Sequence, residues 1–165
     1  MAQVITNPDI TIRVQEADFD VGVEVAALTA NDPRAGAVAS FVGLVRDRND
    51  GDGVSEMTLE HYPGMTEKAL TQIVADAQQR WTLYRVTVIH RVGRLLPCDR
   101  IVLVAVSSAH RGEAFAACEF IMDYLKTEAP FWKREVTPQG ARWVDAREID
   151  DTAMRRWIKD APAAG

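Results

Sequence analysis

The order of hydrophobic and polar residues predicts the first strands and the first helix of the chain. Residues 10–15 (ITIRVQ) alternate between apolar and polar types, which predicts a strand with one buried face. Residues 20–29 predict a short helix. The segment 36–46 (GAVASFVGLVR) is a nearly continuous apolar run of strand length, which is typical of a strand buried on both faces. We therefore expect this segment at the centre of a sheet.

Turn-forming residues mark the next change of direction. The polar segment 46–53 (RDRNDGDG) is followed by an alternating segment at 54–62, so the pattern predicts a long hairpin with the preceding strand. After a Pro-Gly turn, Thr66 can cap a helix, and apolar residues then recur at helical spacing as far as Trp81. This helix is expected to pack its apolar side on a sheet.

The second half of the chain adds two strands, a long helix, a hairpin and a polar C-terminal helix. We predict strands at 84–91 and 101–108, a helix at 111–127, and a hairpin made by 131–136 and 141–144. Strands and helices are interspersed without a strict βαβ rhythm, so the fold class predicted is α+β, with helices packed on a mixed sheet. The chain has 165 residues, of which 47% are hydrophobic, and this fits a single domain.

Composition narrows the possible partners and locations. The net charge of -5 disfavours a nucleic-acid partner, because the global field repels phosphates. The sequence has neither a membrane-length apolar run nor a leader-like N-terminus, so we expect a cytoplasmic protein that does not enter a membrane. The two cysteines are far apart and suggest neither a metal site nor a redox dithiol, and no cofactor is expected. We expect a folded domain at 10–157, with flexible ends at 1–9 and 158–165.

The segment from Ser107 to Arg111 could bind an anion. It lies where a buried strand ends and a long helix begins, so free backbone N–H groups and the helix dipole meet the side chains of His110 and Arg111. A solvated helix cap is the alternative. A Ser-His hydrolase is a weaker interpretation, because the segment lacks the G-x-S-x-G motif and an orienting carboxylate.

A second group of candidate residues flanks the turn at Pro130. Lys126 lies near the end of the predicted helix, and Lys133, Arg134 and Glu135 follow in the next strand. Clustered cations lower a lysine pKa and can make an amine available for chemistry, and Glu135 could orient either amine. The alternative for Lys126 is simple complementarity to the helix dipole.

Two further sites are weaker candidates. Arg46 ends the apolar run at 36–46 and could hold an anion, although an ordinary loop arginine has the same pattern. His61 and Tyr62 lie in a strand-to-helix turn and could be structural or functional.

Helix length separates the first two groups. Arg111 and Lys126 are fifteen helical residues apart, which corresponds to roughly 22 Å. One chain therefore cannot bring both to the same small molecule. Either there are two sites, or a symmetric dimer combines the His110 and Arg111 of one copy with the lysines of the other.

Five motifs in register make the sequence recognisable. In order, they are VASFVGLVRDRN, LEHYPGM, VTVIHRVG, SSAHRGEAF and DYLKTEAPFWKRE. From about Ile10 to Trp157 the chain resembles the large, catalytic subunit family of molybdopterin synthase. The resemblance implies an α/β hammerhead-type fold and a central homodimer. It also implies a heterotetramer, with a small ubiquitin-like subunit bound at each end. The thiocarboxylated C-terminus of that subunit supplies sulfur to cyclic pyranopterin monophosphate, which becomes molybdopterin.

The resemblance also implies a set of site residues. Lys126 and Lys133 match the family's catalytic lysines, with Lys126 at the end of the inserted tail of the small subunit. The pterin-binding positions are Leu44, Val45, Arg46, Lys126, Lys133, Arg134 and Glu135, together with His110 and Arg111 of the neighbouring copy. Only a backbone contact is expected at Leu44, because some relatives carry a polar residue there. The alternative function is a non-catalytic dimeric module that binds a phosphorylated metabolite.

Overall fold

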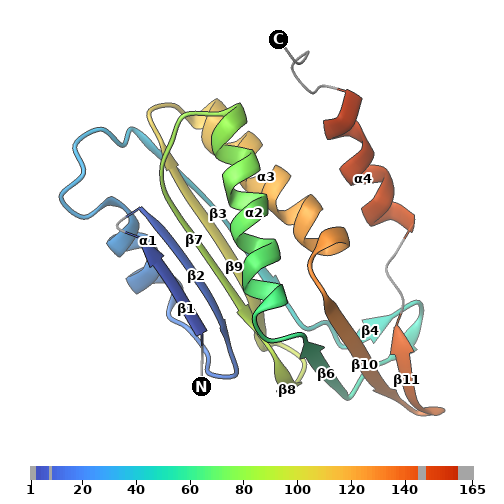
Figure 1. The fold of residues 1–165 in the computed structure, drawn as a ribbon. Coiled ribbons are helices and arrows are strands. Elements are labelled where there is room, and N and C mark those ends of the chain that lie inside the picture. The colour runs from blue at the N-terminus through green and yellow to red at the C-terminus, as the bar shows by residue number, and fades with distance from the viewer. Residues whose placement is uncertain (1–2, 8, 145–147, 160–165) are drawn as a thin grey trace.

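The most apolar segments of the chain form the larger of its two main sheets. A computed structural model describes residues 3–7, 9–144 and 148–159. Five of its strands lie in the order β1-β2-β7-β9-β3 (Figure 1). Their bounds are Gln3–Asn7 for β1, Ile10–Gln15 for β2, Leu83–Arg91 for β7, Arg100–Ser108 for β9 and Ala37–Leu44 for β3. Only the β2 and β7 pair is parallel, so the sheet is mixed, as predicted.

Helices cover both faces of this sheet. The helix α1 (Val21–Thr29) packs on one face, and the long helices α2 (Met65–Arg80) and α3 (Arg111–Glu128) pack side by side on the other. Among the helices that the structure describes, none is both long and apolar enough to cross a membrane. The predicted α+β class, with helices packed on a mixed sheet, is confirmed.

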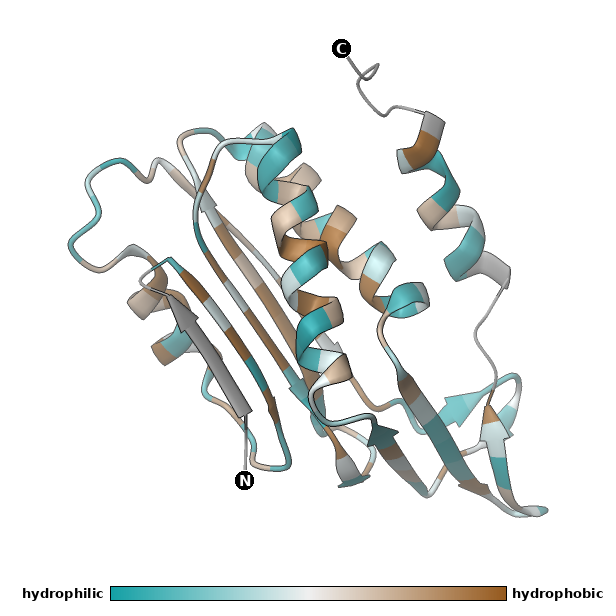
Figure 2. Ribbon diagram, in the orientation of Figure 1, coloured by the Kyte–Doolittle hydropathy of each residue, from teal (hydrophilic) through white to brown (hydrophobic). Residues whose placement is uncertain are grey.

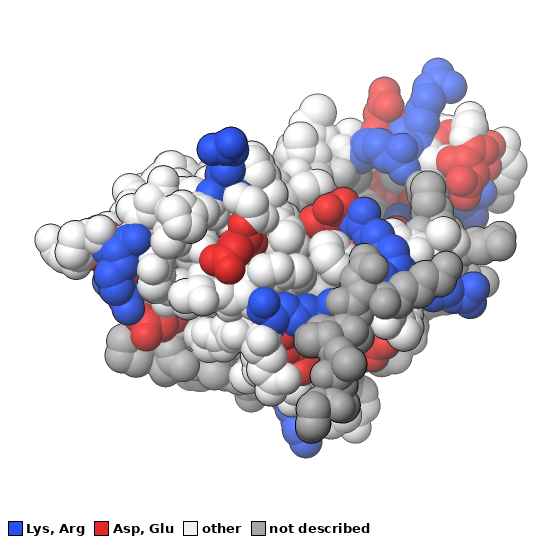
Figure 3. All heavy atoms as spheres, turned by 90° about the horizontal axis from the view of Figure 1, so that it is seen from above, with Lys and Arg blue, Asp and Glu red and all other residues white. Residues whose placement is uncertain are grey.

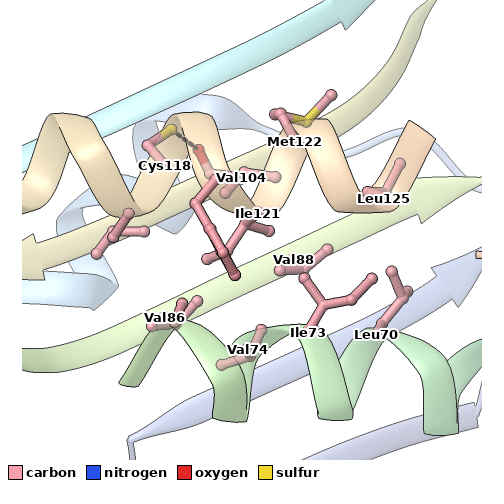
Figure 4. Close-up of a cluster of buried hydrophobic side chains, with 14 of the residues drawn as sticks. Leu70, Ile73, Val74, Val86, Val88, Val104, Cys118, Ile121, Met122 and Leu125 are labelled. Carbon is pink, nitrogen blue, oxygen red and sulfur yellow. Dashed lines mark hydrogen bonds between the residues drawn. The ribbon is translucent and has the colours of Figure 1, made fainter. Parts of the chain in front are cut away.

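The main core lies between the sheet and the α2–α3 pair. Side chains from both helices meet those of β7 and β9 there, and these two strands are largely hydrophobic (Figures 2 and 4). Phe120 is 1% exposed and packs edge-on against Trp81, which follows α2. Burying a side chain of this size contributes about 3 kcal/mol of transfer free energy. The core therefore fixes the position of α3 on the sheet.

A second, smaller sheet extends beyond the C-terminal end of α3. Its strands lie in the order β11-β10-β6-β8. Their bounds are Gly140–Val144 for β11, Phe131–Thr137 for β10, Glu56–His61 for β6 and Gly93–Leu95 for β8. The β10–β11 hairpin confirms the prediction for the two C-terminal strands. A C-terminal helix, α4 (Glu148–Lys159), packs on α3 through Trp157.

The prediction that residues 36–46 form a central strand is wrong, because β3 is the last strand of its sheet. Its apolar side chains are used in three ways. Ala39 is buried under α3, and Val38 and Val42 pack on the opposite face near α1. Phe41 and Leu44 remain 43% and 54% exposed. The continuous apolar pattern therefore reflects two covered faces together with an uncovered edge.

The predicted long hairpin at 36–62 is also wrong. β3 and β6 belong to different sheets, and the Asp- and Gly-rich residues between them form a small ribbon of β4 (Arg48–Asn49) and β5 (Asp52–Gly53). The cap of α2 differs too. Gly64, with φ of 85°, is the N-cap, and its N–H donates to Glu67 Oε2 at 2.7 Å. A positive φ of this kind favours glycine.

The N-terminal segment contains a strand where the sequence suggests a flexible end. Residues 3–7 form β1, which pairs antiparallel with β2 along its whole length. Antiparallel backbone pairing with a neighbouring strand can define so short a strand, although its sequence has no recognisable strand pattern. The segment 158–165 lies mostly outside the described residues. The bounds of 10–157 for the domain stay a prediction.

Candidate active site

A pocket of about 570 Å³ opens where the two sheets meet. The end of β3 and the last turn of α3 form one side, and β6 and β10 form the other. Six residues predicted from the sequence line this pocket, and they are Leu44, Val45, Arg46, Lys126, Lys133 and Glu135. Segments that are far apart in the sequence thus bring the cationic side chains of Arg46, Lys126 and Lys133 to one cavity, which Arg48 also lines.

Strand alternation decides which β10 residues face the pocket. Lys133 and Glu135 pair with Leu59 and Met57 of β6, and all four line the cavity. Arg134 lies between them, so its side chain points to the opposite face of the sheet, where it is paired with Trp143 of β11. Arg134 is therefore not brought together with the two lysines.

His110 and Arg111 lie at the other end of α3. Arg111 is the first residue of the helix and Lys126 is in its last turn, so the two are separated by roughly 22 Å. His110 is the N-cap residue, but its side chain makes no capping hydrogen bond. Neither residue lines the pocket of its own chain. The separation that the sequence predicted is confirmed.

Glu135 connects the pocket to the small ribbon. Its side chain is only 3% exposed, and Oε1 lies 3.4 Å from Lys133 Nζ. Asn49 Nδ2 donates to the same oxygen at 2.8 Å, and Arg142 Nη2 donates to Oε2 at 3.4 Å. A buried carboxylate is stable when it has several such donors. This arrangement holds the Lys133 ammonium against a fixed negative charge. Arg142 Nη1 also donates a hydrogen bond to Asp52 Oδ2 of the ribbon at 2.8 Å, so Arg142 links Glu135 to the ribbon.

Sequence patterns did not identify His90 as a site residue, although it lines the pocket. The ring is 5% exposed and stacks on Phe131, with centroids 3.8 Å apart. Its Nδ1 lies 2.8 Å from the carbonyl oxygen of Arg91, which assigns the proton to Nδ1. Burial lowers the pKa of the His90 imidazole from 6.5 to about 3, and the charge of Lys126 adds to this effect. His90 is therefore neutral at physiological pH.

The depressed pKa of His90 predicts a loss of stability in mild acid. Because the unfolded chain takes up a proton near pH 6.5 and the folded chain only near pH 3, stability falls as the pH drops between these values. The fall is at most about 1.4 kcal/mol per pH unit. Urea unfolding between pH 6.5 and 5 measures this slope. In His90→Gln, whose side chain does not titrate, this part of the slope should disappear. An unchanged slope would contradict the assignment.

The surroundings of several other candidate residues indicate a structural role and not a catalytic one. Ser107 is fully buried, and its Oγ accepts a hydrogen bond from the Arg85 N–H at 3.0 Å. It is therefore inaccessible as a nucleophile, which argues against the hydrolase interpretation. Burial raises the pKa of the Cys118 thiol to about 12, so this cysteine does not provide a thiolate. His61 and Tyr62 do not line the pocket.

The charge on one face of the molecule does not suggest a site for a polyanion. On the face seen in Figure 3, Lys and Arg side chains are interspersed with Asp and Glu side chains. The cations of the pocket are few and are positioned individually. This arrangement suits a small anionic ligand better than a long charged chain.

Comparisons with known proteins agree with this geometry. Residues 14–128 match the family model described as MoaE protein. The molybdopterin synthase catalytic subunit of Ralstonia nicotianae is 74% identical over 147 residues, which are 89% of this chain and 84% of that protein. The subunit of the same name from Escherichia coli is 62% identical over 139 residues, which are 84% and 92% of the two chains.

Solved structures give the same result for the fold. The molybdopterin biosynthesis MoaE protein of Burkholderia ambifaria has a TM-score of 0.77 and 59% identity, and the match covers 92% of this chain and 99% of that one. Molybdopterin synthase from Staphylococcus aureus has a TM-score of 0.73 and 30% identity, with coverage of 80% and 95%. Sequence and fold therefore agree, and the chain belongs to the MoaE family, as its motifs suggested.

Proposed function

We propose that this protein is the catalytic subunit of a molybdopterin synthase. In this role it transfers sulfur from the thiocarboxylated C-terminus of a small ubiquitin-like subunit to cyclic pyranopterin monophosphate, which forms the dithiolene of molybdopterin. The observation that carries the proposal is the pocket in which Arg46, Lys126 and Lys133 converge. Family membership and the names of close relatives support it.

The charges of the pocket fit this chemistry. The cyclic phosphate of the substrate is an anion, and Arg46 can bind it together with His110 and Arg111 of a second copy. The thiocarboxylate is also anionic, and its attack develops a tetrahedral species with negative charge. Lys126 and Lys133, placed beforehand on a rigid helix end and a strand, can stabilise that charge. Glu135 is a positioning residue in this proposal, because it holds Lys133.

The proposed assembly is a central homodimer with one small subunit at each end. The homodimer supplies His110 and Arg111 from the copy that does not provide the lysines. We also propose that the protein acts in the cytoplasm. Substrate binding by Leu44, Val45 and Arg134 is part of the same proposal, with Arg134 contributing from outside the pocket of its own chain.

Reconstitution tests the proposed function. The purified protein is incubated with a thiocarboxylated small subunit and cyclic pyranopterin monophosphate, and dithiolene formation is measured. The expected result is molybdopterin formation that depends on the thiocarboxylate, since an unmodified small subunit provides no sulfur. If the protein binds the pterin but forms no dithiolene, it is the non-catalytic binding module instead.

We predict that Ser107→Ala is nearly silent in this assay. The hydroxyl is buried and bonded to the Arg85 backbone, so its loss should cost about 1 kcal/mol of stability and leave the rate of sulfur transfer within about twofold of wild type. Thermal unfolding and dithiolene formation measure the two effects. A rate loss as deep as that of a catalytic lysine variant would support a catalytic serine.

A further inference from the structure

Two residues outside the predicted site set hold the buried carboxylate of Glu135. Asn49 Nδ2 donates to its Oε1 at 2.8 Å, and Arg142 Nη2 donates to its Oε2 at 3.4 Å. Lys133 Nζ lies 3.4 Å from Oε1, and Lys133 lines the pocket whereas Arg142 does not. Lys133 is therefore the cation of this cluster that can reach a ligand, and Arg142 binds the carboxylate from outside the pocket.

We propose that Asn49 and Arg142 are positioning residues for sulfur transfer, because they fix the carboxylate that holds Lys133. The inference rests on the proposed function, in which Lys133 stabilises the charge that develops in the reaction. It adds two residues to that function, together with the ribbon of β4 and β5, to which Asn49 belongs.

The turn of the ribbon explains how Asn49 is held beside Glu135. Asp50 and Gly51 connect β4 to β5 with φ angles of 52° and 85°, and positive φ at both central residues is typical of a type I′ hairpin turn. Just after the ribbon, the Ser55 N–H donates to a carbonyl oxygen of β10 at 3.0 Å. The ribbon is thus fixed beside the β10–β11 hairpin (Figure 1), and the Asn49 side chain is almost fully buried.

Arg142 joins the hairpin to the ribbon. It pairs with Glu135 across β10 and β11, and side chains of directly opposed residues in an antiparallel pair interact. The guanidinium also donates to Asp52 at 2.8 Å and to the Asn49 carbonyl oxygen at 3.4 Å. The hydrogen bond to Asp52 raises the pKa of Arg142 above its usual value, and the bond to Glu135 adds to this effect. Arg142 therefore remains a cation throughout the physiological pH range.

This arrangement allows Lys133 to leave Glu135 during the reaction. A buried carboxylate that loses its only cation is strongly destabilised, so a carboxylate paired with Lys133 alone would keep that ammonium for itself. Arg142 on one oxygen and Asn49 on the other leave Glu135 with a cation and a hydrogen-bond donor when Lys133 turns to a ligand. Without Asn49, Oε1 loses its shorter contact and draws Lys133 away from the pocket.

Single-turnover sulfur transfer by Asn49→Ala tests the positioning of Lys133. We expect the maximal rate to fall about tenfold. The pterin concentration that gives half of this rate should stay within about twofold, because Arg46 and Lys126 are unchanged. In the Lys133→Ala background the same substitution should change the rate by less than about twofold, since the residue through which Asn49 acts is missing. A further tenfold loss in that background would overturn the proposal.

Gln72→Ala is the matched control for Asn49→Ala. Gln72 Nε2 donates to a carboxylate oxygen of Asp76 at 2.8 Å on the exposed surface of α2, so an amide–carboxylate bond of the same length is lost outside the pocket. The rate should equal that of wild type. A loss comparable to that of Asn49→Ala would overturn the inference, because it would show that the effect does not depend on position.

Two substitutions of Arg142 separate its charge from its shape. Lysine keeps the charge but cannot donate to Glu135 and Asp52 from one planar group, so we expect Arg142→Lys to lower the rate about threefold. Arg142→Met loses both properties and should lower the rate about tenfold. A wild-type rate in Arg142→Met would overturn the role of Arg142.

Thermal unfolding provides a readout that does not require sulfur transfer. Lys133→Ala should lower the melting temperature by about 4 °C more in Arg142→Met than in wild type, because Glu135 then loses both cations. A double variant that fails to fold although both single variants fold is the extreme form of this result. Equal shifts in the two backgrounds would overturn the inference even if wild type forms the dithiolene. The coupled shift in a protein that forms no dithiolene would instead reject the proposed function.

Discussion

Lys126→Ala and Lys133→Ala are each expected to reduce dithiolene formation by about 100-fold or more, because both ammonium groups act on charge that develops in the reaction. Both line the pocket, and both are partly accessible to solvent. Lys126→Ala should therefore change the free energy of unfolding by only about 0.5 kcal/mol. Lys133→Ala also removes a partner of the buried Glu135 carboxylate and should lower the free energy of unfolding by about 1–3 kcal/mol. Single-turnover dithiolene formation measures the first effect, and urea unfolding measures the second.

Lys68→Ala is the matched control for these variants. Lys68 is an exposed lysine of α2 and does not line the pocket, so its loss removes the same charge without affecting the site. Activity close to wild type in Lys126→Ala or Lys133→Ala would remove that lysine from the mechanism. A parallel loss in Lys68→Ala would show that net charge, rather than position, matters.

Mixing an Arg111→Ala chain with a Lys126→Ala chain should recover about a quarter of wild-type activity. A mixed dimer contains one site in which both residues are intact and one in which both are lost. Random pairing makes about half of the dimers mixed, provided that subunits exchange freely. Each parent alone should be nearly inactive, because the two residues lie at opposite ends of α3. The rate of dithiolene formation after mixing measures the recovery.

Lys126→Ala and Lys133→Ala provide the control for this complementation. Both residues line the pocket of the same chain, so a mixed dimer of these two variants contains no intact site and should recover nothing. If verified mixed dimers of Arg111→Ala and Lys126→Ala are no more active than either parent, the two basic groups serve separate sites.

Local sequence patterns were sufficient to predict most of the helices and strands. The alternation in residues 10–15 predicted β2, and the apolar spacing in 111–127 predicted α3 to within a residue. The length of α3 then predicted that Arg111 and Lys126 are far apart. These features depend on neighbouring residues in the sequence, so a periodicity read from the chain is enough to find them.

Features that depend on tertiary partners could not be predicted in this way. The apolar run at 36–46 has the same pattern at an edge as at a centre, because burial of both faces does not reveal which strands lie beside it. The bond of Asn49 to Glu135 joins residues 86 positions apart. His90 has an ordinary place in an alternating strand, and only the stacking of Phe131 and the nearby pocket distinguish it.

The length of α3 also has a consequence for the way activity depends on concentration. The two halves of the proposed site are fixed to opposite ends of one helix, whose middle is held by the core through Phe120 and Ile121. No bending within a single chain can bring them together. Dilution below the dissociation constant of the dimer therefore lowers the number of complete sites and leaves the activity of each remaining site unchanged. By mass action, the rate then falls with the square of protein concentration, and the cell can set the output of this enzyme through its abundance alone.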